Sequence, residues 1–162
     1  MPTSHWLPDR TTKKLLSNIK INSFLDIGAG AGKYGKMVSK YHPGAKKIGL
    51  EIDNKYIEEF KLDEIYSEIS NFPEIDLIEK HLDTSYDLVI IGDCIEHMKK
   101  SDGIDLLNFL VYRSKYILIH YPNEYIQGSV DNHIHEAHIS IWHESDFQGF
   151  SYKFIKNGFM HT

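Results

Sequence analysis

A cluster of glycines is the first feature of this chain that points to chemistry. Segment 26–32 (DIGAGAG) holds three glycines separated only by alanines. An apolar stretch precedes the cluster, and residues 33–41 follow it with apolar positions at helical spacing. Without side chains in the way, a ligand can lie directly on the backbone of such a turn. The segment therefore predicts a ligand-binding loop between a strand and a helix.

Three kinds of ligand compete for this loop. The phosphate-loop pattern fails, because Ile27 stands where it needs glycine and Tyr34 where it needs Ser or Thr. The dinucleotide pattern GxGxxG fits residues 30–35, and Glu51 follows about 20 residues later, as a ribose-binding acid would. The third ligand is S-adenosylmethionine, whose cationic amino acid moiety suits Asp26. A pyrophosphate would be repelled by that carboxylate, so Asp26 favours S-adenosylmethionine.

Histidines form a second candidate site. Four of the ten lie in one polar segment: His133, His135, His138 and His143. The spacing HxHxxH is compatible with zinc or iron, with Glu136 or Asp146 as a carboxylate ligand. Exposed loop histidines and a substrate site are the alternatives. Structural zinc sites usually have cysteine ligands or a familiar spacing, and neither is present, so we predict no metal.

Alternating strands and helices must position these residues. We expect helices at 11–20, 33–41, 54–62, 74–82 and 101–110, and strands at 24–27, 47–52, 64–67, 86–91, 115–120 and 150–155. Strands of continuous apolar residues between helices predict an α/β fold, a doubly wound and mostly parallel sheet. Its C-terminal strand region is short or truncated. Such sheets bind ligands outside the carboxyl ends of their strands.

Composition narrows the class of protein. The chain has 162 residues, 41% hydrophobic, which predicts one domain spanning 1–162. A net charge of −5 argues against binding nucleic acid. With a single cysteine, Cys94, and no apolar run that could cross a bilayer or act as a secretion signal, we expect a cytoplasmic protein without membrane contact.

Three segments together resemble a known family. Segment 24–35 (FLDIGAGAGKYG) resembles the first motif, DxGxGxG, of class I S-adenosylmethionine-dependent methyltransferases. Segment 48–53 (IGLEID) is similar to their second-strand motif, and segment 86–98 (YDLVIIGDCIEHM) to their fourth-strand motif with its frequent EH ending. The motifs occur in the family's order and spacing. The resemblance implies a Rossmann-like methyltransferase fold.

The resemblance also implies a cofactor, S-adenosylmethionine, with S-adenosylhomocysteine as its product. The residues it assigns to cofactor binding are Asp26, Gly28, Ala29, Gly30, Glu51, Ile52, Glu68, Ile69 and Asp93. Asp26 would order the loop or contact the cofactor's amino group, and Glu51 would bind the ribose. Glu68 would stand for the family's usual third-strand Asp, although segment 66–72 departs from the common form. For Glu51 and Glu68 the alternative is a solvated surface carboxylate.

A second resemblance concerns the acceptor. Small methyltransferases of glycan and natural-product gene clusters carry a pattern similar to Pro122, Gln127, Asn132, His138-Ile139-Ser140-Ile141-Trp142, Asp146-Phe147 and Gly149-Phe150. This segment follows the fifth strand, where the acceptor normally lies. A hydroxyl acceptor would benefit from a general base, and His97 and His138 are our candidate catalytic residues, with His120 third. His97 could instead cap a helix or position the cofactor, and Trp142 could fill the core.

These observations predict methyl transfer to a small-molecule acceptor, such as a sugar or natural-product intermediate, by a monomer or homodimer. A nucleic-acid acceptor is disfavoured, since Gly92-Asp93-Cys94-Ile95 replaces the Asn/Asp-Pro-Pro-Tyr signature of base amino-methylating enzymes. The alternative is a non-catalytic S-adenosylmethionine-binding protein, or a subunit needing a partner chain, because residues 150–162 predict at most one strand where the family commonly has an antiparallel pair. The third hypothesis, from GxGxxG and Glu51, is an NAD-dependent oxidoreductase.

Overall fold

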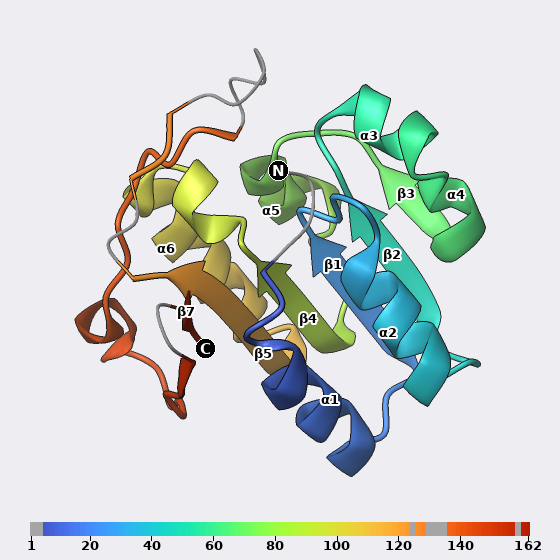
Figure 1. Cartoon of the computed structure of the whole chain (residues 1–162), viewed down its shortest axis with the longest axis horizontal. Coiled ribbons are helices and arrows are strands. Elements are labelled where there is room, and N and C mark those ends of the chain that lie inside the picture. The colour runs from blue at the N-terminus through green and yellow to red at the C-terminus, as the bar shows by residue number, and fades with distance from the viewer. Residues whose placement is uncertain (1–4, 124–125, 129–135, 158–159) are drawn as a thin grey trace.

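A seven-stranded sheet forms the centre of the protein, in the order β3-β2-β1-β4-β5-β7-β6 (Figure 1). The computed structural model describes residues 5–123, 126–128, 136–157 and 160–162. The strands are β1 Ser23–Ile27, β2 Lys46–Leu50, β3 Glu68–Ser70, β4 Tyr86–Gly92, β5 Ser114–Pro122, β6 Lys156–Asn157 and β7 Met160–His161. The first five pair in parallel, which confirms the predicted α/β architecture.

Helices cover both faces of this sheet. They are α1 Asp9–Asn18, α2 Lys33–Tyr41, α3 Asn54–Glu59, α4 Leu62–Ile65, α5 Leu77–Lys80 and α6 Lys100–Leu110, with 3₁₀ turns η1 Glu74–Asp76, η2 Ile95–His97 and η4 Glu144–Phe147. In Figure 1, α1 and α2 lie in front of the sheet and α5 and α6 behind it. No helix in the described ranges is both long and apolar enough to cross a bilayer.

Successive side chains of the buried strands point to opposite faces of the sheet, so a hydrophobic core forms on each face. Phe24 of β1 and Leu88 of β4 pack toward α1, α2 and α4, whereas Leu25 and Val89 pack toward α5 and α6. Every residue of β4 is buried, which explains why this strand reads as a continuous apolar run. Leu25 lies between Ile48 and Val89 in parallel register, so β1, β2 and β4 end at one edge.

Several element boundaries differ from the predictions. The third strand is Glu68–Ser70 rather than 64–67, because residues 62–65 form α4. The helix predicted at 54–62 ends at Glu59, and Lys61 takes a left-handed conformation with φ of 49° before α4 begins. The helix predicted at 74–82 is a 3₁₀ turn followed by the short α5.

The C-terminal region contradicts the prediction of at most one strand. No strand covers 150–155; instead β6 and β7 form an antiparallel pair of two-residue strands. β7 pairs antiparallel with Tyr121 and Pro122 of β5. The C-terminal strand region is therefore short, as predicted, although it holds a pair of strands, and the non-catalytic or partner-dependent alternative stays a prediction.

Candidate cofactor and acceptor site

The glycine cluster forms the loop between β1 and α2. Gly28 and Gly32 have φ of 73° and 72°, values that favour glycine. A Cβ on Gly28 would lie 2.6 Å from Sγ of Cys94, so the loop has no space for a side chain there. The backbone N–H groups of Gly28 and Ala29 both donate to the Leu50 carbonyl at 2.9 Å. The loop is thereby held against the carboxyl end of β2.

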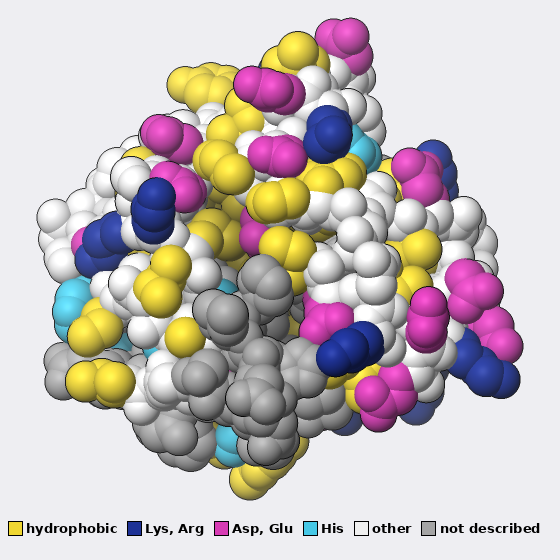
Figure 2. Space-filling view, turned by 90° about the horizontal axis from the view of Figure 1, so that it is seen from above, with side chains coloured by type: hydrophobic (Ala, Val, Ile, Leu, Met, Phe, Trp, Pro, Cys, Tyr) yellow, Lys and Arg dark blue, Asp and Glu magenta, His cyan; other side chains and the backbone are white. Residues whose placement is uncertain are grey.

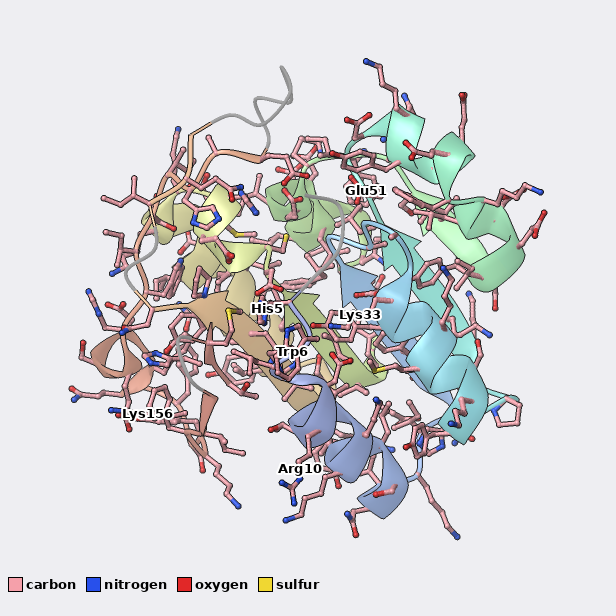
Figure 3. The ribbon with its side chains drawn as sticks, in the orientation of Figure 1. His5, Trp6, Arg10, Lys33, Glu51 and Lys156 are labelled. Carbon is pink, nitrogen blue, oxygen red and sulfur yellow. The ribbon has the colours of Figure 1, made fainter. Side chains whose placement is uncertain are left out.

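Glu51 holds the same loop from the end of β2. Its Oε2 accepts the Gly30 N–H at 2.7 Å, and its Oε1 accepts the Asp53 N–H at 2.9 Å. The side chain is buried, and burial raises the pKa of its carboxyl group. Glu51 is therefore not a solvated surface carboxylate. Its labelled position in Figure 3 is near the carboxyl end of β2.

Asp26 lies beneath the loop rather than open to a ligand. It is fully buried and accepts a 2.5 Å hydrogen bond from the Tyr66 hydroxyl. Burial raises the pKa of its carboxyl group to about 8, so the neutral acid predominates at pH 7. The electrostatic argument that favoured S-adenosylmethionine over a dinucleotide therefore does not hold. Its hydrogen-bond partners are the Tyr66 hydroxyl and the backbone of Gly35 in α2, so Asp26 holds the start of α2, and its predicted role in ordering the loop stays a prediction.

The third strand does not bring Glu68 to the site. Glu68 is the first residue of β3, at the end opposite the carboxyl edge, and pairs with Lys46 at 3.2 Å. Ile69 packs in the core beside Gly49. At the carboxyl edge stands Asn71, whose Nδ2 donates to the carbonyls of Glu51 and Ile52, both at 2.8 Å. Asn71 was missed because the predicted strand ended three residues early, at 67, which put Glu68 at the edge.

Asp93 lies at the carboxyl end of β4, where the N-terminal residues cross the edge. It adopts φ of 51°, and its Oδ2 accepts the His5 N–H at 2.7 Å. Lys33 Nζ donates to the His5 carbonyl at 2.6 Å and pairs with Asp9 at 2.5 Å. Figure 3 shows His5 and Lys33 close together there. No motif in the sequence marked His5 or Lys33 as part of this edge.

The segment predicted to bind the acceptor packs on η2, directly after β4. The N–H groups of Ile139 and Ser140 donate to the Glu96 carbonyl at 2.9 and 3.1 Å. Trp142 is buried, as a core residue would be, and its Nε1 donates to the Ile95 carbonyl at 3.1 Å. These contacts fix residues 138–142 beside the end of β4.

This packing brings the two predicted catalytic histidines together. The rings of His97 and His138 lie 4.9 Å apart, edge to face. His97 Nδ1 lies 3.1 Å from the Ala137 carbonyl, and burial lowers the pKa of its imidazole. His138 Nε2 lies 3.9 Å from Oε1 of Glu96, a buried carboxyl group whose pKa burial raises. The sequence showed Glu96 only as part of the EH ending.

Other sequence candidates are structural or lie elsewhere. His120 is fully buried, its ring nitrogens lie 2.9 Å from the hydroxyls of Thr12 and Thr162, and burial lowers its pKa to about 3. Such an imidazole is neutral and engaged at both nitrogens, which does not suit a base. Asp146 accepts hydrogen bonds from Lys100 Nζ and from the His143 N–H, both at 2.8 Å, which gives it a structural role at η4. His133, His135 and Asn132 lie outside the described residues.

The predicted cofactor loop, Glu51, Asp93 and the histidine pair thus share one edge of the sheet. Figure 2 looks onto this edge and shows hydrophobic side chains bordering a recess in which an acidic side chain is visible. A recess at the carboxyl ends of parallel strands is where doubly wound folds bind their ligands.

Comparison with solved structures decides the fold. A SAM-dependent methyltransferase from Archaeoglobus fulgidus matches 74% of the chain with a TM-score of 0.59 and 22% identity. An O-methyltransferase family protein from Burkholderia thailandensis matches 96% with a TM-score of 0.66 and 14% identity. The chain has the class I methyltransferase fold.

A third solved structure with this methyltransferase fold is a plantazolicin methyltransferase in complex with SAH, which matches 88% of the chain with a TM-score of 0.61 and 22% identity. The chain spans only 53%, 54% and 64% of the length of these three proteins. No protein-family model and no curated protein matches the sequence.

Proposed function

We propose that the chain binds S-adenosylmethionine at the glycine loop and transfers its methyl group to a small-molecule acceptor. The observation that carries the proposal is the Glu51 carboxylate, held at the carboxyl end of β2 by the Gly30 N–H of the loop itself. A ribose diol is a suitable partner for such an acid. Gly28 and Gly30 carry no side chains, so the loop offers its backbone to the rest of the ligand.

Each part of the edge contributes to binding or orientation. When bound, S-adenosylmethionine supplies an electrophilic methyl group, so the protein needs no nucleophile of its own. Gly28, Ala29 and Gly30 would present backbone to it, Glu51 would hold the ribose, and Ile52 would contact the adenine. Asp93 lies toward the end of β4, where the acceptor approaches. Holding the methyl donor and the acceptor in line would make their bimolecular reaction effectively unimolecular, which supplies much of the rate acceleration.

The acceptor site lies beyond the ends of β4 and β5 in this proposal. Residues 138–142 pack on η2 there, and their pattern is the one that resembles small-molecule methyltransferases. His97 and His138 face each other at this place. In the predicted general-base role, a ring nitrogen would take a proton from an acceptor hydroxyl. The plantazolicin methyltransferase, with the same fold, supports a natural-product intermediate as one class of acceptor.

Calorimetric titration with S-adenosylmethionine and S-adenosylhomocysteine tests the proposal. We expect one equivalent to bind the wild type, and Glu51→Ala to weaken binding at least about 10-fold, since a charge-assisted hydrogen bond contributes about 1.5–3 kcal/mol. Glu64→Ala is the matched control, because Glu64 is exposed and pairs only with neighbouring Lys61 among the ion pairs of the described residues. Glu68→Ala should also bind normally, since Glu68 pairs with Lys46 away from the edge.

Failure of the folded wild type to bind either compound would overturn the proposal. Binding of NADH in place of S-adenosylmethionine, seen by saturation-transfer NMR, would favour the oxidoreductase hypothesis. Binding without methylation in an acceptor screen of sugars and other small hydroxyl or carboxyl metabolites would favour a non-catalytic binding protein.

A further inference from the structure

We propose that Glu96, His97 and His138 bind a divalent transition-metal cation next to Asp93. The three side chains each offer one ligand atom, and these atoms lie within 4.8 Å of one another. Two come from η2, which follows β4, and the third from the segment that packs on it. The site therefore exists only in the folded chain, at the carboxyl edge of the sheet.

The spacing of the ligand atoms is somewhat wider than that of an occupied metal site. In a tetrahedral site with metal–ligand bonds of about 2.1 Å, neighbouring ligand atoms lie roughly 3.4 Å apart. His138 Nε2 and Glu96 Oε1 lie 3.9 Å apart, too far for a hydrogen bond and about half an ångström wider than this edge. The remaining ligand pairs lie within 4.8 Å, so they would have to approach by at most about 1.4 Å to close around an ion.

A buried carboxylate oxygen is the second observation that points to a cation. Glu96 is 3% exposed, and its Oε2 accepts no hydrogen bond from any described residue. Oδ1 of neighbouring Asp93 is likewise buried without a hydrogen-bond partner among the described residues. Orphaned polar atoms at one place are costly unless a ligand satisfies them. A cation bound by the imidazoles of His97 and His138 would satisfy the unpaired carboxyl oxygen of Glu96.

The surroundings of His97 also fit a ligand. A proton on Nδ1 can be donated to the Ala137 carbonyl 3.1 Å away, which leaves the lone pair on Nε2. Histidines that bind metals usually donate their other nitrogen in this way, because the contact fixes the tautomer and the ring orientation.

The donor set selects the kind of metal. Two imidazoles and one carboxylate suit Zn²⁺, Fe²⁺, Co²⁺ or Mn²⁺, whereas Mg²⁺ and Ca²⁺ prefer oxygen ligands alone. Three protein ligands leave positions open for another oxygen ligand. An acceptor oxygen could occupy one of them, and this last step rests on the proposed function, whereas metal binding does not. An imidazole nitrogen that binds a metal cannot also accept a proton from the acceptor. The metal site therefore replaces the general-base role of His97 and His138.

The proposed ligands lie far apart in the sequence, which is why the sequence analysis predicted no metal site. The spacing HxHxxH drew attention to His133, His135 and His138 as one group, with Glu136 or Asp146 as the acid. The structure instead places His138 with Glu96 and His97, some forty residues earlier in the chain. Ligands so far apart carry no spacing pattern.

Titration of chelator-treated protein with Zn²⁺, and with Co²⁺ followed by visible absorption, tests the assignment. We expect one equivalent to bind, with a Co²⁺ spectrum typical of nitrogen and oxygen ligands. Loss of a supporting contact around a metal site costs about 10–100-fold in affinity, so Glu96→Gln and His138→Ala should each cost about 100-fold or more. His143→Ala is the matched control, because His143 is an exposed histidine five residues from His138.

Three results would overturn the assignment: no stoichiometric binding, unchanged affinity in Glu96→Gln, or loss confined to a His133→Ala/His135→Ala variant. Circular dichroism and thermal unfolding establish whether each variant is folded. If His138→Ala does not fold, the metal affinity of Glu96→Gln, which keeps the shape of the side chain, tests the assignment. Titration of the same samples with S-adenosylhomocysteine separates the two proposals. Metal binding without S-adenosylhomocysteine binding would reject the proposed function alone, and the reverse would reject the metal site alone.

Discussion

The buried acid beneath the glycine loop should make the protein less stable as the pH rises. Asp26 is fully buried, and burial raises the pKa of its carboxyl group from 3.8 to about 8. The folded protein therefore keeps a proton on Asp26 over a range in which the unfolded chain has lost it. Asp26→Asn removes this proton while keeping an oxygen to accept the Tyr66 hydroxyl bond.

The size of the effect follows from linkage between protonation and folding. Between the two pKa values unfolding releases a proton, so the free energy of unfolding falls with pH by about 1.4 kcal/mol per unit. The contribution is complete below the unfolded pKa near 4 and is lost as the pH approaches about 8. From pH 5 to pH 8 the wild type should lose roughly 4 kcal/mol relative to Asp26→Asn, out of a total of about 5–15 kcal/mol.

Urea denaturation at pH 5, 6, 7 and 8 measures this difference. Asp87→Asn is the control, because the hydrogen bond from Lys115 lowers the pKa of Asp87. That carboxylate is ionised in both the folded and the unfolded states above pH 5, so its substitution should shift stability by a constant. Parallel pH profiles for the wild type and Asp26→Asn would refute a buried, protonated Asp26.

Three further substitutions have defined outcomes. Gly28→Ala should cost at least about 1–2 kcal/mol by urea denaturation, because φ is 73° and the new Cβ would meet Cys94, and should weaken S-adenosylhomocysteine binding in calorimetry. Trp142→Ala should cost about 3–5 kcal/mol, since it removes a buried indole bonded to the Ile95 carbonyl. The imidazole of His120 has a pKa of about 3 in the folded protein, so between pH 6.5 and 4 only the unfolded chain takes up a proton at this residue. The wild type therefore loses stability as the pH falls through this range, and His120→Gln should lose less, as measured by acid denaturation.

The architecture was accessible from the sequence where buried strands and helices have strong patterns. β4 is apolar along its length, and α2 coincides with the predicted residues 33–41. The prediction was wrong where tertiary contacts override local pattern. The strand pair β6–β7 has two residues per strand, too few to carry any periodicity, and it depends on pairing with Tyr121 and Pro122.

The candidate site likewise has features that the sequence predicted and features that depend on tertiary contacts. The glycine loop and Glu51 lie next to each other because both follow strands with clear motifs. The protonation of Asp26 could not be predicted, because it depends on burial under the loop. The meeting of Glu96 with His138 depends on hydrogen bonds from Ile139 and Ser140 to the Glu96 carbonyl, and no residue pattern encodes that packing.

The place of β1 between β2 and β4 delays the completion of its strand pairing while the chain is being synthesised on the ribosome. Leu25 pairs with Ile48 on one side, but its other neighbour, Val89, is 64 residues further along. Until β4 has left the exit tunnel, one edge of β1 keeps its backbone groups unpaired and its apolar side chains exposed. At about 5–20 residues per second this interval lasts several seconds, and a chaperone bound during synthesis would have its main task there.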